Sequence, residues 1–449
     1  MIADFLDART IDRYVDAVRK ALDDPALRPK AQQAAETIGR GASDPVQAVK
    51  ATLPDQAGPP SSGGHQDYPF FSRDSVVSLI QTSLEDEAHK AQNVTTEPHE
   101  SGLKHFWHSI ERLLHIEHFG PDDPEWVTKI AAAMLDRLAK GNHAFNTAPA
   151  QATMADDARL MIVGDWGSGL QRALTVASLM GEKIDEARQQ GRDVHVIHLG
   201  DVYYSGDPVE YRRHVLDDGR WPVKPEDAGA VKSWALMGNH DMYSGGYGFY
   251  DTLLADPRFK HQSANGAGTS FFRISSGHWD IAGLDTSWDP NVLSLGQRGV
   301  LQNPQASVLD GWAGESTRRL MVLTHHQLVS AYDLGDLGTV LPFKLQSLLH
   351  AGRIDAWMWG HEHRCMGFGE VADAPKVIRC IGNGGIPMPA SSMKEPPPPP
   401  GTWQSAKTFT DDDGTWTRFG YAVLDFAGEA VTANYYDDTD PQPVHTESF

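Results

Sequence analysis

Cysteine is scarce in this chain: only two of its 449 residues, Cys365 and Cys380, are cysteines. Two cysteines form one bridge at most, so a disulfide-stapled scaffold is excluded and free thiols are expected. Long apolar runs are also missing, since no stretch approaches the roughly 20 apolar residues of a membrane-spanning helix. The first residues, MIADFLDARTIDRY, carry acids where a secretory signal has basic residues, and no apolar segment follows. The sequence therefore predicts a cytoplasmic protein with no membrane contact.

Basic residues are also few relative to acidic residues. The chain has 39 Lys and Arg residues against 60 Asp and Glu residues, which gives a formal net charge of −21. Binding to DNA or RNA depends on Lys and Arg neutralising phosphates, so no nucleic-acid partner is expected. A small anionic substrate stays compatible with this charge, because a bound metal can supply positive charge locally.

The chain divides by pattern into two parts. Residues 1–145 show apolar spacings typical of helices, interrupted by a Pro-, Gly- and Ser-rich segment at 53–69, and predict a helical N-terminal region of unknown role. This region could cap a site, form an oligomer or bind a protein partner. Residues 146–449 instead contain short apolar runs that end in glycine and polar residues, with helix-length segments between the first of them. This alternation predicts a layered α/β catalytic domain.

Residues able to bind metal ions follow five of the predicted strands. They are Asp165 in GDWG, Asp201 and Tyr204 in GDVYY, Asn239 and His240 in GNHD, His325 and His326 in THH, and His361 and His363 in GHEH. Residues at the carboxyl ends of neighbouring parallel strands meet at one edge of a sheet, where α/β folds place their sites. A preceding glycine lets the backbone turn sharply there.

The mixture of donors narrows the kind of metal. Carboxylate, amide oxygen, imidazole and phenolate suit hard or borderline ions. The ligands are too many for one tetrahedral zinc ion and are about enough for two ions that share a bridge. Each motif alone has a plain alternative, such as a turn or a hydrogen-bonded histidine at a sheet edge, but the ordered set favours a metal centre.

The order GDxG, GDxxY, GNHD, VxxH and GHxH resembles the calcineurin-like metallophosphoesterases, and within them it is most similar to the purple acid phosphatase type. The resemblance covers residues 158 to about 445 and implies a β-sandwich flanked by helices. Most of this superfamily has D-x-H in the first motif, but here the third position is Gly167. Tyr204 stands where purple acid phosphatases carry a tyrosinate ligand.

The resemblance also implies roles for single residues. One metal would take Asp165, Tyr204 and His363, the other Asn239, His325 and His361, and Asp201 would bridge them. The two ions would be iron and a divalent ion, which could be iron, manganese or zinc. His240 would donate to the substrate phosphate or act as general acid, with Asp241 orienting it. The alternative for His240 is that it only supports its loop.

Four further residues are candidates for substrate binding. His326 is expected in the pocket wall or behind the ligands, and Arg364 is as compatible with a surface ion pair as with a phosphate contact. Tyr243 lies in an aromatic, glycine-rich segment that suits a pocket rim or a plain loop. Trp166 either lines the pocket or packs in the core.

Together these features predict a phosphoester hydrolase with two metal ions, in which a metal-bound hydroxide attacks a small phosphorylated substrate. We expect a phosphomonoesterase first, because of the GDxxY pattern. The alternatives are a phosphodiesterase acting on nucleotides or glycerophospho compounds, and a catalytically weak metal-binding scaffold or regulatory protein.

Overall fold

The computed structural model describes residues 141–290, 299–332, 340–411, 414–439 and 441–449, together with Ala133, Asp136, Arg137 and Lys140. The helices predicted for the N-terminal region therefore lie almost wholly outside the described residues. The chain divides into two compact units. The larger unit comprises His143–Met242, Gly246–Asp289 and Arg298–Phe449, and the fold given below is that of this unit.

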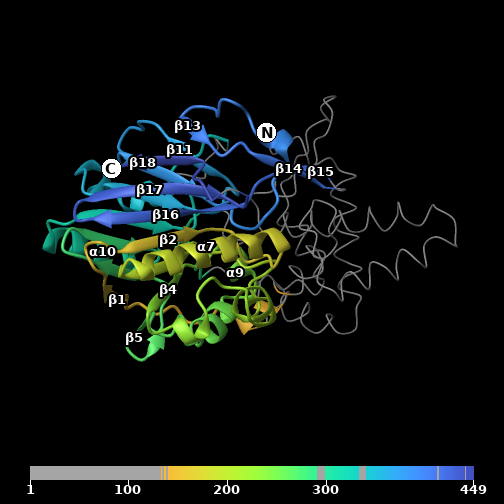
Figure 1. The fold of residues 1–449 in the computed structure, drawn as a ribbon. Helices are drawn as coiled ribbons and strands as arrows, with labels where there is room; N and C mark the ends of the chain where they lie inside the picture. The colour runs from red at the N-terminus through yellow and green to blue at the C-terminus, as the bar shows by residue number, and fades with distance from the viewer. Residues whose placement is uncertain are drawn as a thin grey trace, which may run out of the picture. The chain divides into compact units, whose positions relative to one another are not determined.

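A six-stranded sheet forms one layer of the larger unit, with the strand order β18-β17-β16-β2-β3-β4 (Figure 1). Its strands are β2 (Arg159–Val163), β3 (Val194–His198), β4 (Val231–Ala235), β16 (Gly420–Ala427), β17 (Ala430–Asp437) and β18 (His445–Ser448). Strands β2, β3 and β4 run parallel, so their carboxyl ends share one edge. Strands β16, β17 and β18 form an antiparallel meander joined to β2.

An eight-stranded sheet forms the second layer, with the order β1-β7-β8-β9-β10-β12-β11-β13. Its strands are β1 (Ala150–Thr153), β7 (Phe272–Ser275), β8 (Trp279–Gly283), β9 (Arg319–Thr324), β10 (Ala356–Trp359), β11 (Cys365–Phe368), β12 (Val377–Ile381) and β13 (Gly401–Gln404). The central strands β8, β9, β10 and β12 are parallel. Two small hairpins pair β5 (Ser263–Ala264) with β6 (Ala267–Gly268) and β14 (Thr408–Asp411) with β15 (Gly414–Thr417).

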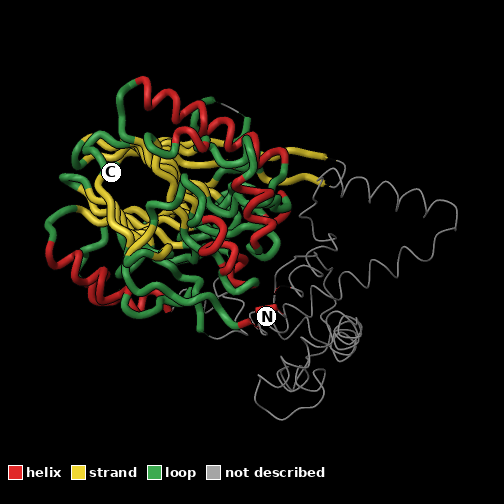
Figure 2. Tube along the Cα trace, turned by 90° about the horizontal axis from the view of Figure 1, so that it is seen from below, coloured by secondary structure: helices red, strands yellow, loops and turns green. Residues whose placement is uncertain are grey.

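Helices cover the outer faces of both sheets, as Figure 2 shows from below. On the six-stranded sheet lies α7 (Gln171–Gln189), and on the eight-stranded sheet lie α10 (Gln305–Glu315) and α12 (Gln346–His350). The other described helical segments are α8 (Pro208–Glu210), α9 (Asn239–Tyr243) and α11 (Val340–Lys344), with short π or 3-10 turns η2 (Tyr211–Leu216), η3 (Pro225–Asp227), η4 (Gly248–Leu253) and η6 (Ala390–Ser392). Within the described part of the chain, no helix has both the length and the apolar character needed to cross a bilayer.

The alternation of side chains along β2 explains the layering. Met161 and Val163 belong to the apolar cluster that includes the buried face of α7, whereas Leu160 and Ile162 belong to the cluster between the two sheets. Successive strand residues point to opposite faces, so one strand serves two cores. A third cluster joins the other face of the eight-stranded sheet to α10 and α12, through residues such as Leu309. The result is a β-sandwich flanked by helices, which confirms the predicted fold class.

Candidate metal centre

The carboxyl ends of strands from both sheets carry the predicted ligands. Asp165 follows β2, Asp201 follows β3, and Asn239 begins the short helix after β4. His325 directly follows β9, and His361 follows β10. The six-stranded sheet thus supplies oxygen donors and the eight-stranded sheet supplies imidazoles.

Four of these positions have an unusual backbone. The φ angles are 56° at Asp165, 71° at Asp201, 66° at His361 and 49° at His363. A residue with a Cβ atom adopts this left-handed region at a cost of roughly 1–2 kcal/mol, so it persists only where surrounding contacts enforce it. Of the six non-glycine residues with positive φ in the described part of the chain, four are predicted ligands. This concentration of strain points to a functional site.

Glycines beside the ligands allow the carboxylates to pack against the backbone. A Cβ atom at Gly238 would lie 1.9 Å from Oδ1 of Asp201, and one at Gly360 would lie 2.6 Å from Oδ2 of Asp165. Both distances are far shorter than a van der Waals contact. The glycine in GNHD and the glycine in GHEH are therefore required by the carboxylate of another motif as well as by the local turn.

A first cluster contains Asp165, Asp201 and His363, whose ligand atoms lie within 4.8 Å of one another. The hydroxyl of Tyr203 lies among them, 3.0 Å from Oδ1 of Asp165, 3.1 Å from Oδ2 of Asp201 and 3.0 Å from Nε2 of His363. Burial, and then the charges of the two aspartates, raise the pKa of Tyr203 well above its ordinary value. A bound cation would oppose both effects and favour the tyrosinate.

Tyr203 is a residue that sequence reasoning missed, since the resemblance pointed to Tyr204. The backbone of Tyr204 has a different task, because its carbonyl oxygen lies 2.7 Å from Nδ1 of His240. The structure favours Tyr203 as the tyrosine of the centre, and the ligand role of Tyr204 stays a prediction. The pair of adjacent tyrosines in GDVYY was the only signal, and spacing alone does not decide between them.

A second cluster contains His325, His326 and His361, whose ligand atoms also lie within 4.8 Å of one another. Nδ1 of His325 lies 3.0 Å from the carbonyl oxygen of Leu199 and donates to it, so Nε2 carries the lone pair. That lone pair lies 3.0 Å from Oδ1 of Asn239 and 3.2 Å from Nδ1 of His361. An imidazole lone pair that faces an amide oxygen at this distance is an arrangement that a cation would stabilise.

Burial keeps these imidazoles in the form that binds metal. It is the main reason why the pKa values of His325 and His361 lie well below the ordinary histidine value, and neighbouring imidazoles lower them further. His326 lies with the other two imidazoles in this cluster, and its predicted place in the pocket wall or behind the ligands stays a prediction. Its Nδ1 lies 2.9 Å from Oγ1 of Thr286.

Asp201 lies between the two clusters. Its Oδ1 is 3.5 Å from Nε2 of His325, and its Oδ2 is 3.1 Å from the hydroxyl of Tyr203. Burial, and then the charges of Asp165 and Asp241, raise the pKa of Asp201 well above its ordinary value. Two oxygens of one carboxylate that face two groups of ligands are the geometry of a bridging ligand.

The donor set fits two metal ions. Among the described residues, the only potentially cationic side chains that pair with Asp165 or Asp201 are histidines, and no Lys or Arg does so. Buried carboxylates without a cation are costly, and a metal is the usual remedy. Carboxylate, phenol, amide oxygen and imidazole together suit hard or borderline ions.

His240 presents its ring to the centre. Nδ1 is held by the carbonyl oxygen of Tyr204, and Nε2 lies 4.0 Å from Oδ2 of Asp201. Its ring lies over that of Tyr203, with the centroids 4.5 Å apart. Burial lowers the pKa of His240 to about 3. The imidazole is therefore neutral in the metal-free protein at ordinary pH.

The contacts of Asp241 show a supporting task in the loop that carries Asp201, while its expected role in orienting His240 stays a prediction. Its carboxylate accepts hydrogen bonds from the backbone of Gly238 (2.7 Å), Asp201 (3.0 Å) and Val202 (3.0 Å), and from the hydroxyl of Tyr211 (2.8 Å). Burial raises the pKa of Asp241 to about 7. Asp241 thus holds the loop that carries Asp201. A backbone carbonyl, that of Tyr204, also contacts the His240 ring.

The other three candidates for substrate binding, Trp166, Arg364 and Tyr243, are buried side chains. Trp166 is 1% exposed, donates from Nε1 to the carbonyl oxygen of Ala173 and belongs to the core cluster beneath α7. The guanidinium of Arg364 stacks on Tyr332 at 3.6 Å and donates to Ser392. Tyr243 is buried. The surroundings of Trp166 match core packing, whereas Arg364 is buried and not in a surface ion pair, and Tyr243 ends α9 and not a plain loop. Substrate contacts of these three residues stay predictions.

Two glutamates outside the ligand set, the buried Glu210 and the partly buried Glu362, hold the ligand loops, and sequence reasoning did not single them out. The carboxylate of Glu210 accepts from the backbone of Tyr204 (2.7 Å), Ser205 (2.9 Å) and Asp207 (3.1 Å), and from the Ser205 hydroxyl (3.1 Å). Glu362 accepts from Nε1 of Trp359 and from the hydroxyl of Ser330. The D-P-x-E capping box around Glu210 was the one local signal.

Comparison with known proteins agrees with this geometry. Residues 158–365 match the family model of calcineurin-like phosphoesterases. This region is a calcineurin-like phosphoesterase domain. The enzyme class predicted from the sequence, a metal-dependent phosphoesterase, is thereby confirmed. No curated protein matches the chain.

Several solved structures are similar to the chain, all at low identity. GAP50, described as the anchor in the inner membrane complex of Plasmodium, is 13% identical, with a TM-score of 0.43 over 65% of this chain and 88% of that one. A dimetal phosphatase from Danio rerio is 13% identical, with a TM-score of 0.40 over 67% and 99% of the two chains. PhoD is also 13% identical, with a TM-score of 0.40 over 67% and 70%.

Proposed function

We propose that the phosphoesterase domain hydrolyses phosphate monoesters of small molecules at a centre of two metal ions, one of them iron. The observation that carries this proposal is the position of Asp201, whose two carboxylate oxygens face the two ligand clusters. A single carboxylate in this position can hold two ions close enough to act on one phosphoryl group.

The residues divide into two sets around that bridge. Asp165, Tyr203 and His363 would hold one ion, and Asn239, His325 and His361 the other, with His326 beside the second set. When bound, such ions lower the pKa of water and neutralise the phosphoryl oxygens.

His240 is the residue best placed to handle the ester oxygen. Its Nδ1 is fixed by the carbonyl oxygen of Tyr204, which leaves Nε2 directed at the centre. An imidazole held in this way can hydrogen-bond the ester oxygen and pass a proton to the leaving group. The contact of its backbone N–H with Oδ1 of Asp201, at 2.9 Å, couples its position to the bridge.

Charge favours the monoester over the diester. A trivalent and a divalent ion bring about +5, and two aspartates with a tyrosinate remove about 3 of these charges. The remaining positive charge stabilises the dianion of a monoester more than the monoanion of a diester. The GDxxY pattern, in which Tyr204 resembles the purple acid phosphatase tyrosine, also favours a monoesterase.

The test compares two substrates on the full-length protein reconstituted with iron and a divalent ion. We expect two metal ions per chain by elemental analysis, and a kcat/KM for 4-nitrophenyl phosphate at least about tenfold above that for the bis(4-nitrophenyl) ester. His361→Ala should abolish turnover, whereas the matched control His350→Ala, at an exposed histidine of α12, should not. Dominant turnover of the bis-ester would overturn the monoesterase assignment, and binding of two metals without turnover of any phosphoester would overturn the hydrolase.

A further inference from the structure

A narrow recess adjoins the metal centre. Its walls include His363, Asn383, Gln404, Ser405, Thr417 and Arg418. His363 belongs both to this wall and to the first ligand cluster, so one imidazole separates the recess from the metal site. The position of Gly382 gives a second link, since a Cβ atom there would lie 2.9 Å from Oδ2 of Asp165. Asn383 is the next residue in the chain.

The size of the recess limits its occupant. Its volume is about 10 Å³, which is enough for one water-sized group. A phosphate, a carboxylate or an aromatic ring is too large for this space. A single hydroxyl group of a substrate has the required size.

Two buried polar atoms in the recess wall have no partner within the described part of the protein. Asn383 is 4% exposed, and its Nδ2 donates to the carbonyl oxygen of Arg418 at 3.2 Å, which fixes the orientation of the amide. Its Oδ1 makes no hydrogen bond, and neither does Oγ of Ser405. A buried acceptor without a donor is costly, so this pair is suited to a group that both donates and accepts.

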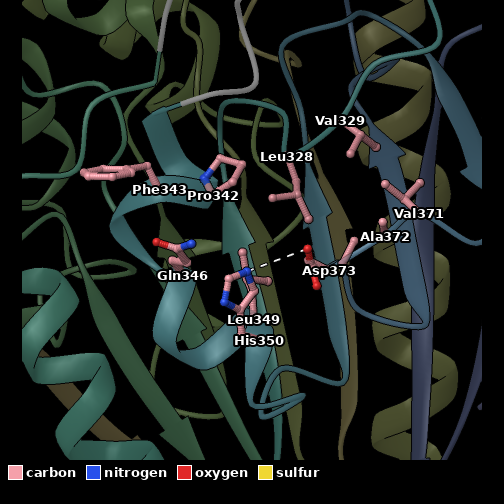
Figure 3. A pocket seen from close by; sticks show the side chains of 11 residues that line it. Leu328, Val329, Pro342, Phe343, Gln346, Leu349, His350, Val371, Ala372 and Asp373 are labelled. Carbon is pink, nitrogen blue, oxygen red and sulfur yellow. Dashed lines mark ion pairs between the residues drawn. The ribbon is translucent and has the colours of Figure 1, made fainter.

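The pocket in Figure 3 differs from the recess, because its walls are mainly apolar. It has a volume of about 280 Å³, and its walls include Leu328, Phe343 and Leu349. Nε2 of His350 lies 3.7 Å from Oδ2 of Asp373 in its wall. It contains no predicted ligand, and its polar groups do not demand a polar occupant in the way that the recess does.

We propose that the recess is a leaving-group subsite that takes one hydroxyl of a polyol phosphate, such as a glycerol or sugar phosphate. The hydroxyl donates to Oδ1 of Asn383 and accepts from Oγ of Ser405. This inference rests on the proposed function and adds the substrate class to it. A site with hydrogen-bonding groups for a hydroxyl discriminates strongly against an analogue that lacks it, because the groups are then left unpaired.

The experiment compares glycerol 3-phosphate with propyl phosphate, which has the same phosphate and chain length but no hydroxyls. With the metal-loaded full-length protein, we expect kcat/KM to be about 10- to 100-fold higher for glycerol 3-phosphate. Ser405→Ala should reduce this ratio to a few-fold. The matched control Ser347→Ala, on the exposed side of α12, should keep the ratio of the wild type.

A second measurement does not depend on turnover. In crystals of the His240→Ala variant soaked with glycerol 3-phosphate, a substrate hydroxyl should lie within hydrogen-bonding distance of Oδ1 of Asn383. Equal kcat/KM values for the two substrates in the wild type, or a water in the recess of the soaked complex, would overturn the subsite. If neither ester is turned over, the proposed function fails, and the soaked crystal alone decides the subsite.

Discussion

The two sheets contribute opposite halves of the metal centre. The six-stranded sheet places carboxylates, a phenol and an amide oxygen at its edge, in Asp165, Asp201, Tyr203 and Asn239. The eight-stranded sheet places only imidazoles there, and burial keeps at least two of them neutral. All the formal negative charge of the candidate ligands therefore lies on one side. A pair of cations between the sheets would balance that charge and give the imidazole lone pairs a partner.

The two edges nevertheless use the same local devices. Each has two ligands with left-handed backbone, Asp165 and Asp201 on one side and His361 and His363 on the other. Each also has a glutamate that holds a ligand loop. Glu210 binds mainly backbone N–H groups, whereas Glu362 binds side chains of Trp359 and Ser330. The oxygen edge is therefore fixed through the main chain, and the imidazole edge through side chains.

The largest effect is expected at the residue that joins the edges. Asp201→Ala should remove the bridge, lower occupancy of both metals and reduce kcat by at least about 1,000-fold, or about 4 kcal/mol. His361→Ala should mainly empty the imidazole side. Metal content by elemental analysis, with kcat on 4-nitrophenyl phosphate, measures both. The metal-free form of Asp201→Ala should melt no earlier than the wild type, because the substitution removes a buried charge. Full occupancy of both metals in Asp201→Ala would contradict the bridge.

The next prediction separates the two adjacent tyrosines of the oxygen edge. If ferric iron is bound by Tyr203, the iron-loaded protein has a phenolate-to-iron absorption band, and Tyr203→Phe should abolish it and lower kcat by about 10- to 100-fold. Tyr204→Phe is the matched control and should keep both the band and most of the activity, because its contact to His240 is made by the backbone. Visible absorption spectra give the answer directly. A band lost only in Tyr204→Phe would restore the spacing inferred from the resemblance.

These tyrosines show what the sequence could and could not predict. The strand ends that carry Asp165, Asp201, Asn239 and His361 were predictable, because a ligand that follows an apolar strand and a glycine depends on neighbouring residues only. The choice of Tyr203 was not, because it depends on the path of the backbone after β3. Three other features could not be predicted from the sequence either, because each depends on partners from distant segments. They are the place of His326 within the second cluster, the contacts of Asp241 and the role of Glu210.

Substitutions of Glu210 and Glu362 should differ in their effect on the free energy of unfolding. In Glu210→Gln, the new amide NH₂ group would face backbone N–H donors that it cannot accept from, so we expect a loss of about 2–3 kcal/mol in the free energy of unfolding. In Glu362→Gln, the amide oxygen can still accept from Trp359 while the NH₂ group donates to Ser330, so the loss should stay below about 1 kcal/mol. Urea denaturation of the metal-free variants measures both values. Equal losses would refute the distinction between main-chain and side-chain support.

The smallest effect concerns a contact that joins the sheets outside the metal-ligand set. Arg379 on β12 pairs with Glu447 on β18, whose carboxylate also accepts from the hydroxyl of Tyr435 at 2.7 Å. Burial raises the pKa of Glu447, but the hydrogen bonds and charge of Arg379 outweigh this effect and leave that pKa below its ordinary value. The folded protein therefore binds the Glu447 proton more weakly than the unfolded chain does. The stabilisation from this pair is present above the pKa that Glu447 has in the unfolded chain, and it is lost as the pH falls through the pKa that Glu447 has in the folded protein.

Glu447→Gln should cost about 1 kcal/mol at neutral pH and little in acid, as measured by urea denaturation at both pH values. The deficit should be the same with and without metals, because the pair is not part of the ligand set. A deficit that grew in acid would show that the contact works through packing and not through charge.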